Sequence, residues 1–245
     1  MILNKNNLVL FIYDHSSKTG NGHLRRCEYF SKIFPKNYKI NYKRYNTQNL
    51  KNLSKKNFKY IIIDSYKISF IVEKKIKKYC EKLITIDDNY NRKFASDAII
   101  NYSSIVSKKN YLGKYSKNSK LFLGNKFNFI KSKKIFKIKK RWDQKKKINI
   151  FIYFGTKNRS ELIKRCIHKI KDKSIINKVF IFNQKKIIPH KVFLKKIIQS
   201  DLLLISSGVT LQEGLNMKKM IFATSFSRNQ KNFYQYYKKK YLIKD

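Results

Sequence analysis

The chain has 245 residues, of which 42% are hydrophobic, so it is long enough for one large or two small domains and too apolar for a disordered chain. Lysine and arginine number 58 against 14 acidic residues, which gives a net charge of +44. All but eight of these cations are lysines, and they are scattered over nearly every segment. The chain is also rich in Ile, Asn, Phe and Tyr, which like lysine have AT-rich codons, so codon composition explains the charge. We therefore expect no specific nucleic-acid partner and only salt-dependent, nonspecific anion binding.

Apolar runs alternate with helical periodicity along the whole chain, which predicts an α/β fold with parallel sheets. In the first half we expect strands at 8–13, 39–45, 60–64, 83–88, 98–101 and 121–124, and helices at 23–34 and 69–80. In the second half we expect strands at 148–153, 179–182, 201–205 and 220–224, and helices at 159–171, 190–199, 211–216 and 229–240.

The chain starts this alternation anew after a strongly basic stretch, 131–147, which lacks long apolar runs. We interpret this stretch as a linker between two Rossmann-like domains, 1–130 and 148–245. Ligands of such parallel sheets bind outside the carboxyl ends of the strands. We therefore predict two domains whose carboxyl strand ends face a shared cleft.

The three cysteines, Cys27, Cys80 and Cys166, are odd in number and far apart, so we expect inert thiols in a reducing cytoplasm and neither disulfides nor a zinc site. No apolar run approaches the roughly 18 residues of a membrane span, and the short N-terminal run does not resemble a signal peptide. We expect a cytoplasmic monomer without cofactor, metal or membrane span.

The loop Gly20-Asn21-Gly22-His23 follows the first strand and opens the first helix. Glycines there can bring backbone N–H groups close to an anion, which a helix N-terminus also attracts. The partial positive charge of the helix N-terminus should disfavour the imidazolium form, so that His23 can act as a general base. The alternative is a tight turn followed by a helix-capping region.

Polar residues also follow the other strands of the first half. Asp64-Ser65-Tyr66 either orients His23, lines a sugar pocket or forms a simple turn. Asp87-Asp88 is either a paired-carboxylate or divalent-metal site, or a strand-end turn with one solvated acid. Asn101 ends a further strand.

In the second half, Ser206-Ser207-Gly208 with Thr210 has the composition of a phosphate cradle at a helix N-terminus. Glu213, about one turn into that helix, can accept hydrogen bonds from a ribose diol. The alternative is a capping box formed by Thr210 and Glu213. The remaining polar residues at strand ends are Gly155-Thr156 and Asn229-Gln230. His15, His168 and His190 have no partner at a ligand spacing, and we interpret them as surface or helix-face residues.

Several of these motifs occur together in one order: G-x-G-H-x-x-R-C from Gly20 to Cys27, Ile63-Asp64-Ser65-Tyr66, Ile86-Asp87-Asp88, Asp97…Asn101, Leu123-Gly124, Ser206-Ser207-Gly208…Glu213 and Asn229-Gln230. In this respect the chain resembles the UDP-2,4-diacetamido-2,4,6-trideoxy-β-L-altropyranose hydrolases of pseudaminic acid synthesis. It also resembles the related spore-coat polysaccharide proteins and, more distantly, the N-acetylglucosamine transferase of peptidoglycan synthesis, with its two-domain glycosyltransferase-B architecture.

The resemblance implies metal-independent hydrolysis of a UDP-linked sugar with inversion at the anomeric carbon. It makes His23 the base that activates water. The residues that it places around the sugar and the pyrophosphate are Gly20, Asn21, Gly22, Arg26, Tyr66, Asp88 and Asn101. Those that it places around UDP are Gly155, Thr156, Ser206, Ser207, Gly208, Thr210, Glu213, Asn229 and Gln230.

The sequence departs from the family pattern at two places. Phe154-Gly155-Thr156-Lys157 stands where two glycines, a Thr or Ser and an Asp are usual, and Ser65 stands where a His is common. A bulky Phe154 could crowd the UDP side of the cleft. Two other functions stay open: a glycosyltransferase of the same fold, and a basic anion-binding protein with a decayed site.

Overall fold

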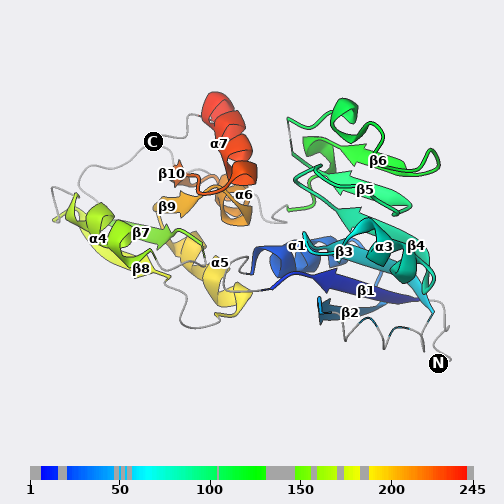
Figure 1. The fold of residues 1–245 in the computed structure, drawn as a ribbon. Coiled ribbons are helices and arrows are strands. Elements are labelled where there is room, and N and C mark those ends of the chain that lie inside the picture. Colours follow the sequence, from blue (N-terminus) through cyan, green and yellow to red (C-terminus); the bar gives the residue numbers. More distant parts are fainter. Residues whose placement is uncertain are drawn as a thin grey trace. The chain divides into compact units, whose positions relative to one another are not determined.

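The structure, a computed structural model, describes residues 7–15, 21–46, 50, 53, 57–103, 105–130, 147–155, 159–169, 174–182 and 188–241. It is an α/β structure with one parallel sheet of six strands and another of four (Figure 1). The chain divides into two compact units, Met1–Phe129 and Ile130–Asp245, each with one of the sheets. Of the predicted linker, 131–147, all but Lys147 lies outside the described residues.

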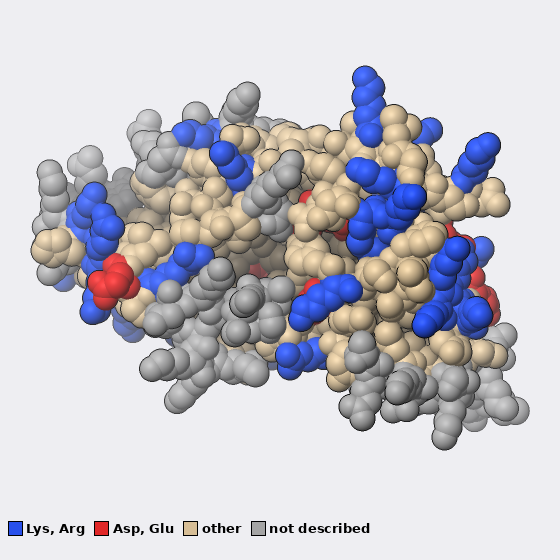
Figure 2. Space-filling view, viewed as in Figure 1, with Lys and Arg blue, Asp and Glu red and all other residues tan. Residues whose placement is uncertain are grey.

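Lysine and arginine side chains are spread over the face of the molecule that Figure 2 shows, and they do not gather into a single stripe. This spread agrees with a compositional origin of the charge. Among the described residues, no helix is both long and apolar enough to span a membrane.

The first sheet has the strand order β2-β1-β3-β4-β5-β6, and neighbouring strands are parallel throughout. Its strands are β1 (Leu8–Tyr13), β2 (Lys39–Arg44), β3 (Phe58–Asp64), β4 (Cys80–Ile86), β5 (Ala98–Asn101) and β6 (Lys120–Leu123). The helices of this unit are α1 (Gly22–Ser31) and α3 (Phe70–Lys77), with 3₁₀ turns η1 (Lys108–Tyr111) and η2 (Asn125–Phe127). The order reverses between β1 and β3, and ligands of doubly wound sheets bind at the carboxyl ends beside such a reversal.

Apolar runs explain why β1 and β3 lie in the centre of this sheet. Val9, Leu10 and Phe11 of β1 are fully buried, as are residues 61–63 of β3. Strands covered on both faces need such continuous apolar sequences, whereas the edge strand β2 is partly exposed and carries lysine and arginine. One face packs into a core cluster formed by Leu10, Ile12, Leu53, Phe58, Ile61, Ile63, Ile68, Ile76 and Leu83.

The second sheet has the order β10-β9-β7-β8 and is also parallel. Its strands are β7 (Ile148–Tyr153), β8 (Ile176–Ile181), β9 (Leu202–Ser206) and β10 (Met220–Thr224). The helices of this unit are α4 (Ser160–His168), α5 (His190–Gln199), α6 (Val209–Asn216) and α7 (Arg228–Tyr241). Counted from the β8 edge, the order β8-β7-β9-β10 corresponds to β2-β1-β3-β4 of the first sheet. The strand order of the second sheet therefore reverses between β7 and β9.

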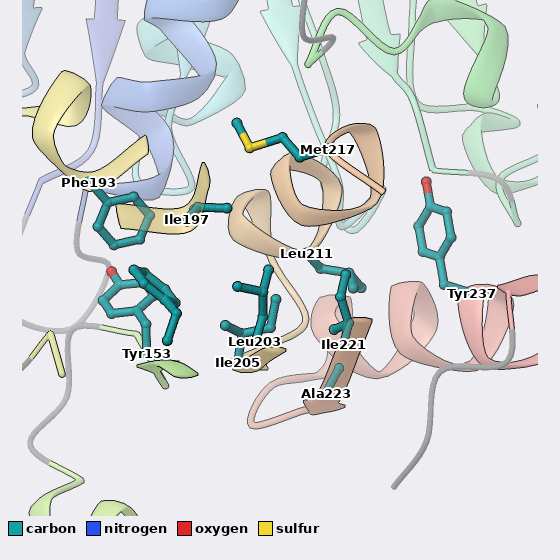
Figure 3. Packing of buried hydrophobic residues seen from close by; sticks show 11 residues of the cluster. Tyr153, Phe193, Ile197, Leu203, Ile205, Leu211, Met217, Ile221, Ala223 and Tyr237 are labelled. Carbon is teal, nitrogen blue, oxygen red and sulfur yellow. The ribbon is translucent and has the colours of Figure 1, made fainter. Parts of the chain in front are cut away.

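The largest core cluster of the second unit joins both of these central strands to three helices. Figure 3 shows Phe193 and Ile197 of α5 beside Tyr153 of β7, and Leu203 and Ile205 of β9 near Leu211 of α6. Tyr237 brings α7 to the same cluster and is only 5% exposed. These three helices, α5, α6 and α7, therefore bury their apolar faces against the same side of the sheet.

The predicted α/β class and the order of the strands and helices are confirmed, while several boundaries differ. The first helix ends at Ser31 and not at residue 34. The predicted helix 69–80 ends at Lys77, because Cys80 already pairs with Phe58 as the first residue of β4. That strand ends at Ile86, so Asp87 and Asp88 belong to the following turn. The two 3₁₀ turns were not predicted.

Candidate active site

The predicted base, His23, lies at the start of α1, just beyond the carboxyl end of β1. Its Nδ1 atom is 2.6 Å from Oδ1 of Asp64, the last residue of β3. Because β1 and β3 are neighbours, with Tyr13 opposite Asp64, the sheet itself brings these two side chains together. Both side chains are buried.

Nδ1 of His23 has two close neighbours, Oδ1 of Asp64 at 2.6 Å and Nη2 of Arg26 at 2.8 Å. Asp64 is the nearer of the two, and lone pairs facing each other at 2.6 Å would repel, so we assign the proton to Nδ1, which donates it to Asp64. This leaves the lone pair on Nε2, the nitrogen that can accept a proton from water. A carboxylate in this position orients the ring and stabilises the imidazolium that forms. Of the three interpretations of Asp64-Ser65-Tyr66, the geometry favours the one in which it orients His23.

Arg26, one turn further along α1, connects Asp64 to Asp88. Its Nε and Nη2 atoms donate to the two oxygens of Asp64 at 2.8 and 2.5 Å, and its Nη1 donates to Oδ2 of Asp88 at 2.6 Å. Burial alone would lower the pKa of Arg26, but Asp64 and Asp88 outweigh it and hold that pKa well above its usual value. Arg26 therefore positions two carboxylates, and its predicted contact with substrate stays a prediction.

Tyr66 forms the exposed edge of this group. Its hydroxyl donates to both oxygens of Asp88, at 2.7 and 2.9 Å, and its ring meets the His23 ring edge-on at 4.7 Å. The side chain of Tyr66 is 40% exposed, whereas Asp88 is 9% exposed. Tyr66 thus contacts both His23 and Asp88, and its contact with a sugar stays a prediction.

The charges of this group do not balance. With His23 neutral, the single positive charge of Arg26 faces the two negative charges of Asp64 and Asp88. The group therefore carries a net negative charge beside His23.

Asp87 points to a different set of partners. Its carboxylate accepts hydrogen bonds from the Tyr111 hydroxyl at 2.6 Å and from the N–H groups of Asn89 and Tyr90. Burial raises the pKa of Asp87. Asn101 donates to the same Tyr111 hydroxyl at 2.9 Å.

The prediction of a strand-end turn at Asp87-Asp88 is therefore right about the turn but wrong about a solvated acid. Both carboxylates are buried, Asp87 at 5% and Asp88 at 9% exposure. Each meets a donor from a part of the chain distant in sequence, Tyr111 of η1 for Asp87 and Arg26 of α1 for Asp88. Within the described parts of the chain, no group of three or more His, Cys, Asp and Glu side chains is arranged to hold a metal ion.

The loop before α1 is only partly described. Gly20 lies outside the described residues. Asn21 occupies the N-cap position of α1 without a side-chain capping hydrogen bond, and its carbonyl accepts the N–H of Arg25 at 3.0 Å. Gly22 is the first helical residue. The alternative interpretation of this loop, a tight turn followed by a helix-capping region, is therefore not supported by a side-chain cap at Asn21.

In the second unit, two predicted residues meet at the corresponding reversal of the sheet. Gly155 follows β7 with φ at +87°, in the left-handed region that favours glycine, and a Cβ added there would lie 3.7 Å from Oγ of Ser206 at the end of β9. The N–H and the hydroxyl of Ser207 both donate to the carbonyl of Thr224, at 2.8 and 3.1 Å. Ser207 therefore fixes this loop to β10.

The capping-box alternative for Thr210 and Glu213 is wrong. Gly208 is the N-cap of α6 and Thr210 lies inside the helix, so Thr210 cannot cap it. Glu213 is 1% exposed, and its Oε1 lies 2.7 Å from Nε2 of His190, the first residue of α5. The interpretation of His190 as a helix-face residue agrees with its place in α5, and its partner Glu213 comes from α6, a pairing that no spacing in the sequence indicates.

The remaining predicted UDP-binding residues lie around the same loops. Gln230 accepts the N–H of Phe226 at 2.9 Å, and a Cβ on Gly208 would lie 3.9 Å from its Nε2, so Gln230 borders the start of α6. Thr156 and the side chain of Asn229 lie outside the described residues.

Phe154, which departs from the family pattern, points into the unit. It is 7% exposed and belongs to a core cluster with Ile150, Ile152 and Ile163. Its carbonyl accepts Nε of Arg159 at 3.0 Å. The core therefore accommodates the larger side chain.

Sequence reasoning did not select Asp14 or Tyr111 for this site. Asp14 accepts the hydroxyl of Ser65 at 2.7 Å and the N–H of Tyr66 at 2.8 Å, and its position directly after β1 was an available signal. Tyr111 comes from a 3₁₀ turn between β5 and β6, and nothing in the local sequence indicates that its hydroxyl reaches Asp87.

No protein-family model matches this sequence, and no curated protein matches it either.

Proposed function

We propose that this chain is a nucleotide-sugar hydrolase that releases UDP from a UDP-linked diacetamido-trideoxy sugar in nonulosonic acid synthesis. The observation that carries the proposal is the pairing of His23 with Asp64 at the point where the first sheet reverses its order. The resemblance of the motifs from Gly20 to Cys27 and at Asp87-Asp88 supports the substrate class.

In the proposed reaction, Nε2 of His23 takes a proton from a water molecule while the water oxygen attacks the anomeric carbon. The bond between that carbon and the diphosphate oxygen breaks, and UDP leaves with the electron pair. Asp64 stabilises the imidazolium of His23, and Arg26 keeps Asp64 in place. Because a diphosphate is a good leaving group, most of the rate enhancement would come from positioning water and stabilising charge.

The second unit would hold UDP. Gly155, Ser206 and Gly208 converge at the carboxyl ends of β7 and β9. The N–H groups of Ser207 and Gly208 already donate to Thr224 and Ser206, so the first N–H groups of α6 are the ones proposed to bind the diphosphate. The resemblance also assigns a ribose contact to Glu213, whose carboxylate is buried beside His190 in this structure. The glycosyltransferase-B arrangement, with both units facing one cleft, is part of this proposal.

The decisive experiment incubates the purified chain with UDP-2,4-diacetamido-2,4,6-trideoxy-β-L-altropyranose in EDTA without an acceptor and measures UDP and free sugar. Equal amounts of both products are expected. Tight UDP binding without release of sugar would instead favour a glycosyltransferase that needs an acceptor. If the chain shows no turnover and does not bind UDP, both proposals are overturned.

We predict that His23→Asn lowers the rate of hydrolysis by about 10²–10⁴-fold, the contribution of a positioned general base, with little change in UDP affinity. Steady-state kinetics and UDP titration measure the two effects. His168→Asn is the matched control, because His168 is exposed at the end of α4 and should leave the rate unchanged. Full activity of His23→Asn would remove His23 from its proposed role.

A further inference from the structure

A cavity of about 380 Å³ lies on the first unit, between α3, the segment that leads from β4 to β5, and the loop before β6. This volume falls in the range of small-molecule sites, which is roughly 300–1,000 Å³. None of the residues that line it belongs to the group around His23. The proposed hydrolysis therefore gives this cavity no role.

The cavity is positively charged. Lys74, Lys77, Lys93 and Lys114 line it, and no acidic side chain does. Lys77 is neutralised by Asp97, with Nζ 2.7 Å from Oδ1, so the other three lysines supply the excess charge. Lysine and arginine side chains are spread over the face that Figure 2 shows, so charge alone would not distinguish the cavity.

One of these lysines is held in place. Lys114 is half-buried, and its Nζ donates to the carbonyls of Tyr90 at 2.7 Å and Asn110 at 2.8 Å. An ammonium group has three N–H donors, so these two bonds leave a third for a ligand. An ordered ammonium loses less side-chain entropy on binding than a mobile one.

The walls are aromatic and rigid. Phe70 and Tyr115 are half-buried at the sides, and Phe94 is buried with Arg92 4.3 Å above its ring. The buried Glu73 accepts the N–H of Ala95 at 2.7 Å and pairs with Arg92 at 2.8 Å, which fixes this wall. The cavity is thus already formed without a ligand.

We propose that this cavity binds a small anion that carries a flat ring, such as an aromatic phosphate or carboxylate. The ring would lie against Tyr115, and the anionic group would meet Lys114, Lys93 and Lys74, whose Nζ lies 4.8 Å from the centre of the Phe70 ring. This proposal does not depend on the function assigned to the His23 site.

Phenyl phosphate is a suitable probe, because it combines a ring with a phosphate and nothing else. Calorimetric titration of the full chain in about 0.15 M NaCl, where long-range attraction is screened, should show saturable binding. Inorganic phosphate and benzyl alcohol should each bind more weakly. No saturation below about 10 mM would overturn the proposal.

Variants separate the cavity from general attraction to a basic protein. Lys74→Gln combined with Lys93→Gln should weaken binding of phenyl phosphate about tenfold, or about 1.4 kcal/mol. Both lysines are exposed, so the double substitution should leave the fold intact. Lys36→Gln combined with Lys191→Gln is the matched control, since both lysines are exposed elsewhere. An equal loss in both double variants would overturn the proposal.

A nucleotide site could also attract phenyl phosphate, so the titration is repeated with saturating UDP. Binding that persists supports a separate cavity. UDP also carries a flat ring and an anion, so displacement is measured in the double variant as well: displacement in the wild type together with unchanged probe binding in Lys74→Gln combined with Lys93→Gln would place the probe elsewhere and overturn the proposal. The outcome is independent of whether the chain hydrolyses a UDP-sugar.

Discussion

Arg26 is the residue on which the geometry of the candidate site depends most. One guanidinium binds Asp64 through two nitrogens and Asp88 through a third, and these carboxylates in turn bind His23 and Tyr66. A planar fork with donors on three nitrogens can do this, whereas a lysine cannot. Removing it would leave two buried carboxylates without their cation, a change that typically costs about 3–5 kcal/mol.

Asp88 should make the stability of the protein depend on pH in the acid range. Burial alone would raise its pKa, but Arg26 and the Tyr66 hydroxyl outweigh burial and hold the pKa below the ordinary value. A carboxyl with a lowered folded-state pKa stabilises the protein above its unfolded pKa of about 3.9, and this stabilisation is lost as the pH falls through the folded pKa.

We therefore predict that Asp88→Asn is less stable than the wild type at neutral pH and that the difference narrows below about pH 4. Urea denaturation at several pH values between neutrality and acid measures it. The raised pKa of Asp87 acts in the opposite sense. Burial, its largest cause, is common to both proteins, whereas the contribution of the Asp88 charge is absent from the variant. A difference that stays constant with pH would contradict this role of Asp88.

At the scale of single elements, α6 shows how closely helix and sheet approach in the second unit. Gly214 lies in this helix against β9 and β10, and a Cβ added there would come 2.6 Å from Leu203 Cδ1 and 3.0 Å from Ile221 Cδ1. Both neighbours are buried in the core cluster of Figure 3 and cannot withdraw easily. The glycine lets the helix pack at this distance.

We predict that Gly214→Ala lowers the free energy of unfolding, because overpacking costs about 1–3 kcal/mol and helix propensity returns at most about 1 kcal/mol. Urea denaturation followed by circular dichroism measures it. Gly22→Ala is the comparison, since a Cβ on Gly22 meets no atom within 4 Å, and it should not destabilise the fold. Equal stabilities of the two variants would show that the core beside α6 can relax.

At the scale of the whole molecule, the net charge of +44 opposes folding through mutual repulsion. The Debye length falls from about 30 Å at 0.01 M to about 10 Å at 0.1 M ionic strength, so salt screens exposed lysines from one another. Buried pairs such as that of Arg26 and Asp64 are screened much less.

We therefore predict that the free energy of unfolding rises when NaCl is increased from about 0.01 M to about 0.3 M. Urea denaturation at each concentration tests this, with sucrose of equal osmolality as the control for non-ionic effects. A fall in stability with salt would mean that attractive surface pairs outweigh the repulsion.

The sequence by itself determined the α/β class, the order of the elements and the concentration of polar residues at strand ends, because hydrophobic periodicity and strand-end composition are local properties. It also selected His23 and the turn at Asp87-Asp88. The boundary at Cys80 could not be predicted, since it depends on pairing with Phe58 in another strand.

Only the tertiary structure decided which partner each polar side chain has. Residues 41 and 62 positions apart in the sequence, His23 with Asp64 and Arg26 with Asp88, meet because parallel strands end at one edge of the sheet. His190 and Glu213 meet because α5 and α6 pack together. Such contacts depend on strand order and helix packing, which no local pattern encodes.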